Sequence, residues 1–131
     1  MDTGYRMKKI TVIMALFFVA CLSAQASHLH LEKEYQQKWR SVHGGQLEYV
    51  LNDCTRVDIL QPEYAIEVEF APKVYESIGQ AFYYASKTGK KPAVVLIMEN
   101  PERDQKYLKR LKAVSEAYGL KYWVITPQDM L

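Results

Sequence analysis

The sequence predicts an α/β protein in which helices flank a mixed β-sheet. Short runs rich in strand formers alternate with segments of helical periodicity, in the order α-β-β-β-α-β-α-β. One run, Ala93 to Met98, is continuously apolar, which is typical of a strand covered on both faces. A chain of 131 residues with 24% charged and 12% aromatic residues has the composition of one globular domain.

The segment from Met1 to Ala26 has the parts of a secretory signal peptide. Basic residues between positions 6 and 9 precede an apolar run, 10–22, and Ala24-Gln25-Ala26 is a small-residue cleavage site. We expect cleavage after Ala26, which leaves a single domain, residues 27–131, in a secreted or periplasmic location. No stable membrane span is expected after this cleavage.

Two alternatives for the N-terminus stay open. Phe18 to Cys21 loosely resembles a lipobox, which would make Cys21 the acylated residue of a lipoprotein. An uncleaved anchor is less favoured because the apolar run is shorter than the roughly 20 residues that span a bilayer.

Charge argues modestly against a general nucleic-acid binder. The signal segment contributes three of the 17 bases and one of the 15 acids, so residues 27–131 carry 14 of each. A neutral domain lacks an overall basic surface, although a local basic strip or a bound metal would still attract a polyanion. Cys54 is the one cysteine of this domain, so no internal disulfide holds it.

The first helix is expected from His28 to His43, because Leu31, Tyr35 and Trp39 recur every four residues, and Gly44 ends it. We expect His28 and His30 to fray, with metal binding as the alternative. The other elements are predicted as strands 46–51, 56–61 and 64–70, helix 73–87, strand 93–98, helix 102–118 and strand 121–126. The bases of the last helix are Arg103, Lys106, Lys109, Arg110 and Lys112, which we expect on a solvated face, with phosphate contact as the alternative.

Acidic residues interrupt the second and third predicted strands. In the run from Tyr64 to Phe70, strand alternation places Glu67 and Glu69 on one face, and a tight turn brings Asp58 beside them. Glu48 on the first strand would complete the set. Clustered carboxylates favour Mg²⁺, Mn²⁺ or Ca²⁺, whereas the alternative is the wet face of an amphipathic sheet.

The following helix carries a polar stripe beside its apolar one. Lys73, Ser77, Gln80 and Tyr84 share a face, and Lys73 comes three residues after the acidic strand ends. The order of Asp58, Glu67-Val68-Glu69 and Gln80-x-x-x-Tyr84 resembles the PD-(D/E)XK nuclease superfamily, in particular its RecB-like branch with a Q-x-x-x-Y motif. The resemblance covers roughly residues 31–98 and implies a restriction-endonuclease-like fold.

The resemblance implies a divalent-metal-dependent nuclease that hydrolyses phosphodiester bonds of DNA or RNA with Mg²⁺ or Mn²⁺. Nucleic acid is then the implied partner; the oligomeric state is not predicted. The implied metal ligands are Glu48, Asp58, Glu67 and the carbonyl of Val68, the catalytic residues are Asp58, Glu67, Glu69 and Lys73, and the substrate-binding residues are Gln80 and Tyr84.

One departure from the family pattern bears on activity. The family has lysine where this chain has Glu69, and that lysine helps to activate the attacking water. Lys73 is the nearest replacement, and a second metal held by Glu69 is another. The alternative function is an exported, non-catalytic member of the same fold that binds a protein or ligand.

Overall fold

The computed structural model describes residues 27–131, so the predicted signal peptide and Cys21 lie outside the described residues. Its elements are α2 (Glu32–His43), β1 (Gln46–Val50), β2 (Arg56–Leu60), β3 (Tyr64–Phe70), η1 (Ala71–Lys73), α3 (Val74–Thr88), β4 (Lys91–Ile97), α4 (Pro101–Tyr118), β5 (Lys121–Ile125) and η2 (Pro127–Met130). The predicted order of helices and strands is confirmed, and every predicted strand is present.

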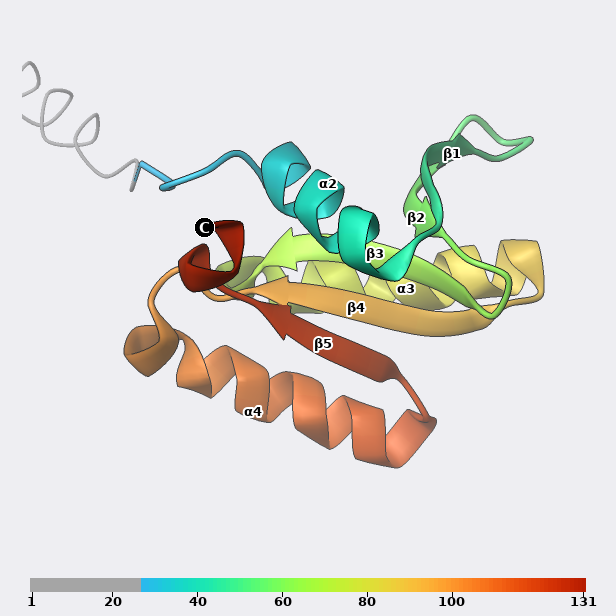
Figure 1. Cartoon of the computed structure of the whole chain (residues 1–131). Helices are drawn as coiled ribbons and strands as arrows, with labels where there is room; N and C mark the ends of the chain where they lie inside the picture. Colours follow the sequence, from blue (N-terminus) through green and yellow to red (C-terminus); the bar gives the residue numbers. More distant parts are fainter. Residues whose placement is uncertain (1–26) are drawn as a thin grey trace, which may run out of the picture.

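The strands form one five-stranded mixed sheet in the order β1-β2-β3-β4-β5. The first three strands are antiparallel neighbours because short turns join them, whereas β3, β4 and β5 are parallel, with helical crossovers between them. Figure 1 shows the β1–β2 hairpin turning away from the rest of the sheet. The protein is thus an α/β domain with helices on both faces of a mixed sheet.

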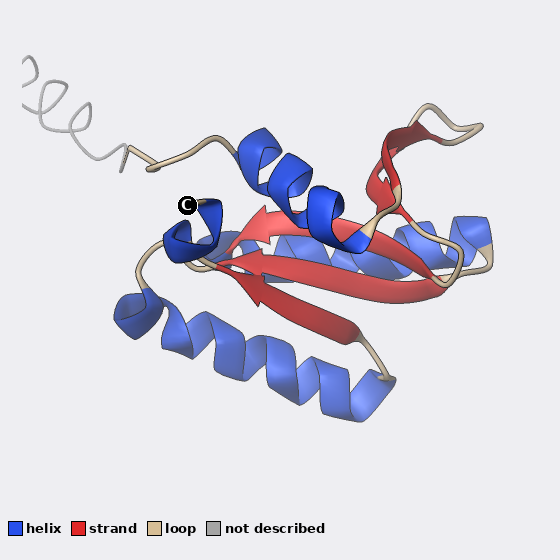
Figure 2. Ribbon diagram, viewed as in Figure 1, coloured by secondary structure: helices blue, strands red, loops and turns tan. Residues whose placement is uncertain are grey.

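Each face of the sheet buries its own core. Tyr35 and Trp39 of α2 pack on Ile66, Val68 and the other apolar side chains of one face. Val94, Leu96 and their neighbours on the other face pack against α3 and α4. Figure 2 shows this three-layer arrangement, with α2 and α4 on opposite sides of the strands. The strand β4 is continuously apolar because helices cover both of its faces.

The first helix begins later than predicted. It starts at Glu32, and Leu31 is its extended N-cap residue, with a side chain 71% exposed rather than packed on the core. Residues ahead of it are held in place by contacts described below, so the expected fraying of His28 is wrong. At its end, Gly45 has φ +112°, and a Cβ there would lie 2.6 Å from Cγ2 of Ile59. This close approach lets α2 lead directly into β1.

None of the helices between residues 27 and 131 is long and apolar enough to cross a membrane.

Candidate functional site

Asp58 lies where β2 and β3 separate. The two strands pair at Ile59–Ile66 and Leu60–Ala65, and the register stops there. Two residues beyond Ile66 on β3, the Asp58 carboxylate takes the place of a strand partner, because its Oδ2 accepts the N–H of Val68 at 2.8 Å. Asp58 is 8% exposed. The side chain therefore replaces a ladder hydrogen bond and holds the sheet open at this point.

Glu67 and Glu69 lie on the face of β3 that carries α3 and α4. Their register partners on β4 are Val94 and Leu96, whose side chains pack under those helices. Both acids are almost fully buried, at 6% and 7% exposure. Oε2 of Glu67 is buried without a hydrogen-bond partner, and Oε1 of Glu69 accepts the N–H of Phe70 at 2.9 Å. The alternation predicted for this strand is confirmed, but the acids line the interior rather than a wet face.

Glu32 is a member of this site that the sequence pattern did not reveal. It begins α2, far from β3 in sequence, yet its pKa is raised to about 8 by burial, by the charge of Glu69 and by a hydrogen bond with that side chain. The charge of Asp58 acts in the same direction. Acidic residues in a first helical turn are ordinarily explained by the helix dipole, so no local signal marks Glu32 as a site residue.

Lys73 brings a positive charge to the acids. Its ammonium Nζ lies 4.0 Å from Oε2 of Glu69, and its charge lowers the pKa of Glu32. The 3-10 turn η1 places it there, one helical turn after Glu69. The lysine side chain is 58% exposed, so the site opens to solvent on this side.

Burial and the mutual repulsion of the acids raise their pKa values. The pKa of Glu67 is raised by burial and by the neighbouring Asp58 carboxylate, with which it shares a hydrogen bond. Burial also raises the pKa of Asp58, although the hydrogen bond from Val68 opposes the rise. We define the carboxylate cluster as Glu32, Asp58, Glu67 and Glu69.

The remaining predicted site residues lie at different distances from the cluster. Tyr84 is buried, and its pKa is raised to about 12 by burial and by the charges of Glu67 and Asp58. The charge of Glu48 raises the pKa of Asp58, but the Glu48 carboxylate itself pairs with Nε of Arg56 at 2.6 Å. Gln80 is exposed on α3. Of the two motif residues on this helix, Tyr84 is therefore the buried one, and it packs with Val57 and Ala65.

The cluster has the donor chemistry of a site for a hard divalent cation, but not its finished geometry. Across residues 27–131, no three His, Cys, Asp or Glu side chains are arranged closely enough to hold a metal ion as they stand. Burial and mutual repulsion instead raise the pKa values of Glu32 and Glu67, and Oε2 of Glu67 is left without a hydrogen-bond partner. Oxygen ligands of this kind suit Mg²⁺ or Mn²⁺, and binding would displace the shared protons.

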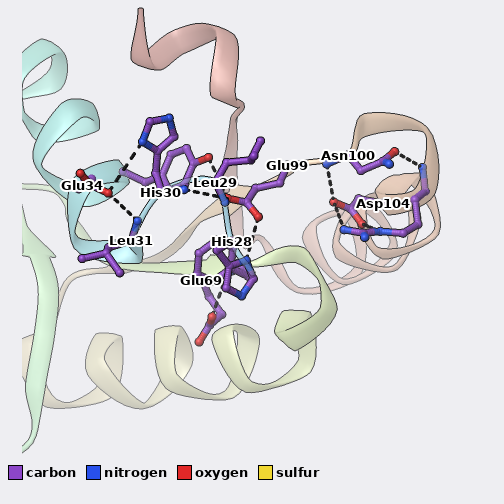
Figure 3. Close-up of polar contacts among 12 residues, drawn as sticks. His28, Leu29, His30, Leu31, Glu34, Glu69, Glu99, Asn100 and Asp104 are labelled. Atoms are coloured by element: carbon purple, nitrogen blue, oxygen red, sulfur yellow. Dashed lines mark hydrogen bonds and ion pairs between the residues drawn. The ribbon is translucent and has the colours of Figure 1, made fainter. Parts of the chain in front are cut away.

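Glu99, a carboxylate outside the cluster, anchors the residues that precede α2. It follows β4, and Figure 3 shows the polar contacts that converge on it. Its oxygens accept the N–H of Leu29 at 2.8 Å, the N–H of His30 at 3.4 Å and the hydroxyl of Tyr35 at 3.2 Å, and they lie 2.8 Å from Nδ1 of His28. Burial acts to raise the pKa of Glu99, but these hydrogen bonds outweigh it and lower the pKa.

This anchor contacts the residue that follows Glu69. The ring of His28 stacks on Phe70, the residue after Glu69, with centroids 3.6 Å apart. The anchored residues then lead into Glu32 at the start of α2. Glu99 thus positions the first turn of the helix that contributes Glu32 to the cluster.

Replacing Glu99 with glutamine should loosen this segment selectively. Hydrogen bonds to a charged acceptor are worth about 1.5–3 kcal/mol, so their weakening should speed amide hydrogen exchange at Leu29 and His30 by roughly tenfold or more. Exposed Glu102 gives the matched control, because Glu102→Gln removes the same charge three residues away. Unchanged exchange in Glu99→Gln would contradict the anchoring role.

A pocket of about 520 Å³ opens elsewhere, between the β1–β2 hairpin and the end of α3. Tyr49, Leu51, Leu60 and Lys87 are among its lining residues, and none of the carboxylate cluster lines it. We place the candidate site at the cluster rather than in this pocket, because perturbed titrating groups gather in the cluster.

Comparison with models of protein families, with characterised proteins and with solved structures gave no match for this chain. The candidate site therefore stands on its own geometry and on the sequence motifs.

Proposed function

We propose that this protein is a divalent-metal-dependent nuclease with a restriction-endonuclease-like fold, and that it hydrolyses phosphodiester bonds of DNA or RNA. The observation that carries the proposal is the carboxylate cluster. It joins buried Asp58, Glu67 and Glu69 of β2 and β3 with half-buried Glu32 of α2, and the Lys73 ammonium lies 4.0 Å from Glu69. The order of the elements and the motif residues agree with the PD-(D/E)XK pattern, except for Glu69 at the lysine position. We further propose that the mature domain is secreted or periplasmic.

The residues of the site would have different roles in the proposed reaction, according to their positions. Asp58 and Glu67, with Glu32 beside them, would hold Mg²⁺ or Mn²⁺, and the Val68 carbonyl is a further ligand candidate because its N–H already bonds to Asp58. The bound ion would polarise the scissile phosphate and lower the pKa of a water molecule. Lys73 would stabilise negative charge at the reacting phosphate, since its ammonium reaches Glu69 and is open to solvent.

Protons must leave the cluster before the ion binds. Because burial and mutual repulsion raise the pKa values of Glu67, Asp58 and Glu32, the affinity for Mg²⁺ or Mn²⁺ should rise with pH. The ion would in turn reverse the sign of the local field, which explains how an overall neutral domain attracts a polyanion.

The test is to incubate residues 27–131 with plasmid and single-stranded substrates in Mg²⁺ or Mn²⁺, with Asp58→Ala as the control. Cleavage that needs the metal and disappears in Asp58→Ala supports the proposal. Equal activity in the two proteins, or none in the wild type with either metal, rejects it.

A second candidate function is a non-catalytic domain of the same fold that binds a protein or ligand. Glu69 at the usual lysine position favours it, as does the predicted export of the chain. Calorimetry separates the two, because a pure scaffold predicts no Mg²⁺ or Mn²⁺ binding that depends on Asp58 and Glu67.

A further inference from the structure

An aromatic and basic surface lies on α3 and α4. It consists of Tyr75 on α3 and Lys106, Tyr107 and Arg110 on α4, and we call it the tyrosine–arginine patch. The guanidinium carbon of Arg110 lies 5.5 Å from the ring centroid of Tyr75 and 5.4 Å from that of Tyr107. Nζ of Lys106 lies 5.0 Å from the Tyr107 centroid. One arginine thus bridges tyrosines of two helices.

The two tyrosines differ in how firmly they are held. Tyr107 is partly buried and packs against the core beneath α3 and α4. Tyr75 is 65% exposed, so most of its ring is available to solvent. The ring therefore offers a face on which a base can stack, with the Arg110 guanidinium beside it.

The charges of the patch are also free to act on a ligand. Within residues 27–131, neither Lys106 nor Arg110 forms an ion pair, whereas Arg103 on the same helix pairs with Asp104. Two unpaired cations beside an exposed ring combine phosphate neutralisation with a stacking platform. Such a combination fits a nucleic-acid strand better than an apolar peptide.

We propose that the tyrosine–arginine patch binds single-stranded nucleic acid by stacking a base on Tyr75 and pairing phosphates with Arg110 and Lys106. A base reaches the face of an exposed ring only when it is not stacked within a duplex, so the patch favours a single strand. Tyr75 comes two residues after Lys73, whose ammonium lies 4.0 Å from Glu69. As a statement about the substrate, this inference rests on the proposed nuclease function.

The test measures binding without cleavage, by fluorescence anisotropy of a labelled single-stranded oligonucleotide of about 12 nucleotides in EDTA, with the duplex of the same sequence for comparison. Tyr75→Leu should weaken binding of the single strand roughly 5- to 150-fold, whereas Tyr75→Phe should retain it. Arg110→Glu should weaken binding and flatten its salt dependence. Exposed Lys112 provides the matched control, since Lys112→Glu makes the same charge change on another face of α4.

Three results would contradict the proposed role of the patch. They are wild-type affinity in Tyr75→Leu, equal losses of affinity in Arg110→Glu and Lys112→Glu, and tighter binding of the duplex than of the single strand. Because EDTA removes the metal, the assay is independent of catalysis. Tyr75-dependent binding without any metal-dependent cleavage would reject the nuclease and retain the patch. Cleavage by a protein whose binding is insensitive to Tyr75 would reject the patch alone.

Discussion

Metal-free protein should lose stability as the pH rises from about 5 to 8, and Glu67→Gln should remove much of this loss. The folded pKa of Glu67 is raised from 4.5 to about 10, chiefly by burial and then by the Asp58 charge. Between these values the folded state keeps a proton that the unfolded state releases. The contribution of Glu67 to the free energy of unfolding therefore falls by about 1.4 kcal/mol per pH unit between these two pKa values.

Glutamine keeps the shape of the protonated acid and has no proton to lose. Glu67→Gln should thus have a flatter stability profile and exceed the wild type by several kcal/mol near pH 8 in EDTA, as measured by urea unfolding. Glu32, whose folded pKa is about 8, also makes the free energy of unfolding fall with pH, and its effect ends at a lower pH than that of Glu67. Glu76→Gln on the exposed side of α3 is the control and should follow the wild-type profile. A Glu67→Gln profile parallel to the wild type would show that Glu67 is not the buried proton carrier.

Replacing Lys73 with methionine should lower kcat by roughly 10²–10³-fold with a smaller change in KM. Removal of one preorganised charge that stabilises a transition state typically has this effect. Lys73 is the cation placed 4.0 Å from Glu69, and the charge of this lysine also lowers the pKa of Glu32. Lys73→Arg keeps the charge and should retain more activity than Lys73→Met.

Lys33→Met is the matched control for general electrostatic attraction. Lys33 follows Glu32 on α2 and is exposed, so its removal changes the net charge equally but leaves the Glu69 contact intact. Equal losses of kcat in the two methionine variants would show that Lys73 acts only through overall charge. Lys73 would then not replace the lysine that the family has at the position of Glu69.

The arrangement of Lys73 shows how local spacing and tertiary contact combine. Spacing along the chain places Lys73 four residues after Glu69, and the structure brings the two side chains to an ion-pair distance. For Gln80 and Tyr84 the same spacing predicts a shared polar face, yet Gln80 is exposed and Tyr84 is buried with Val57 and Ala65. Helical periodicity alone does not say where the edge of a buried face falls, because that depends on what packs there.

Local patterns in the sequence were sufficient to predict the order of helices and strands and the common face of Glu67 and Glu69. Periodicity of 3.6 or 2 residues and glycine stops are short-range signals, which one segment carries by itself. The tertiary structure alone decided that Glu32 joins the cluster, that Asp58 opens the sheet by bonding to Val68, and that Glu99 anchors the chain ahead of α2. These features join residues distant in sequence, and they depend on strand separation and helix placement that no local pattern encodes.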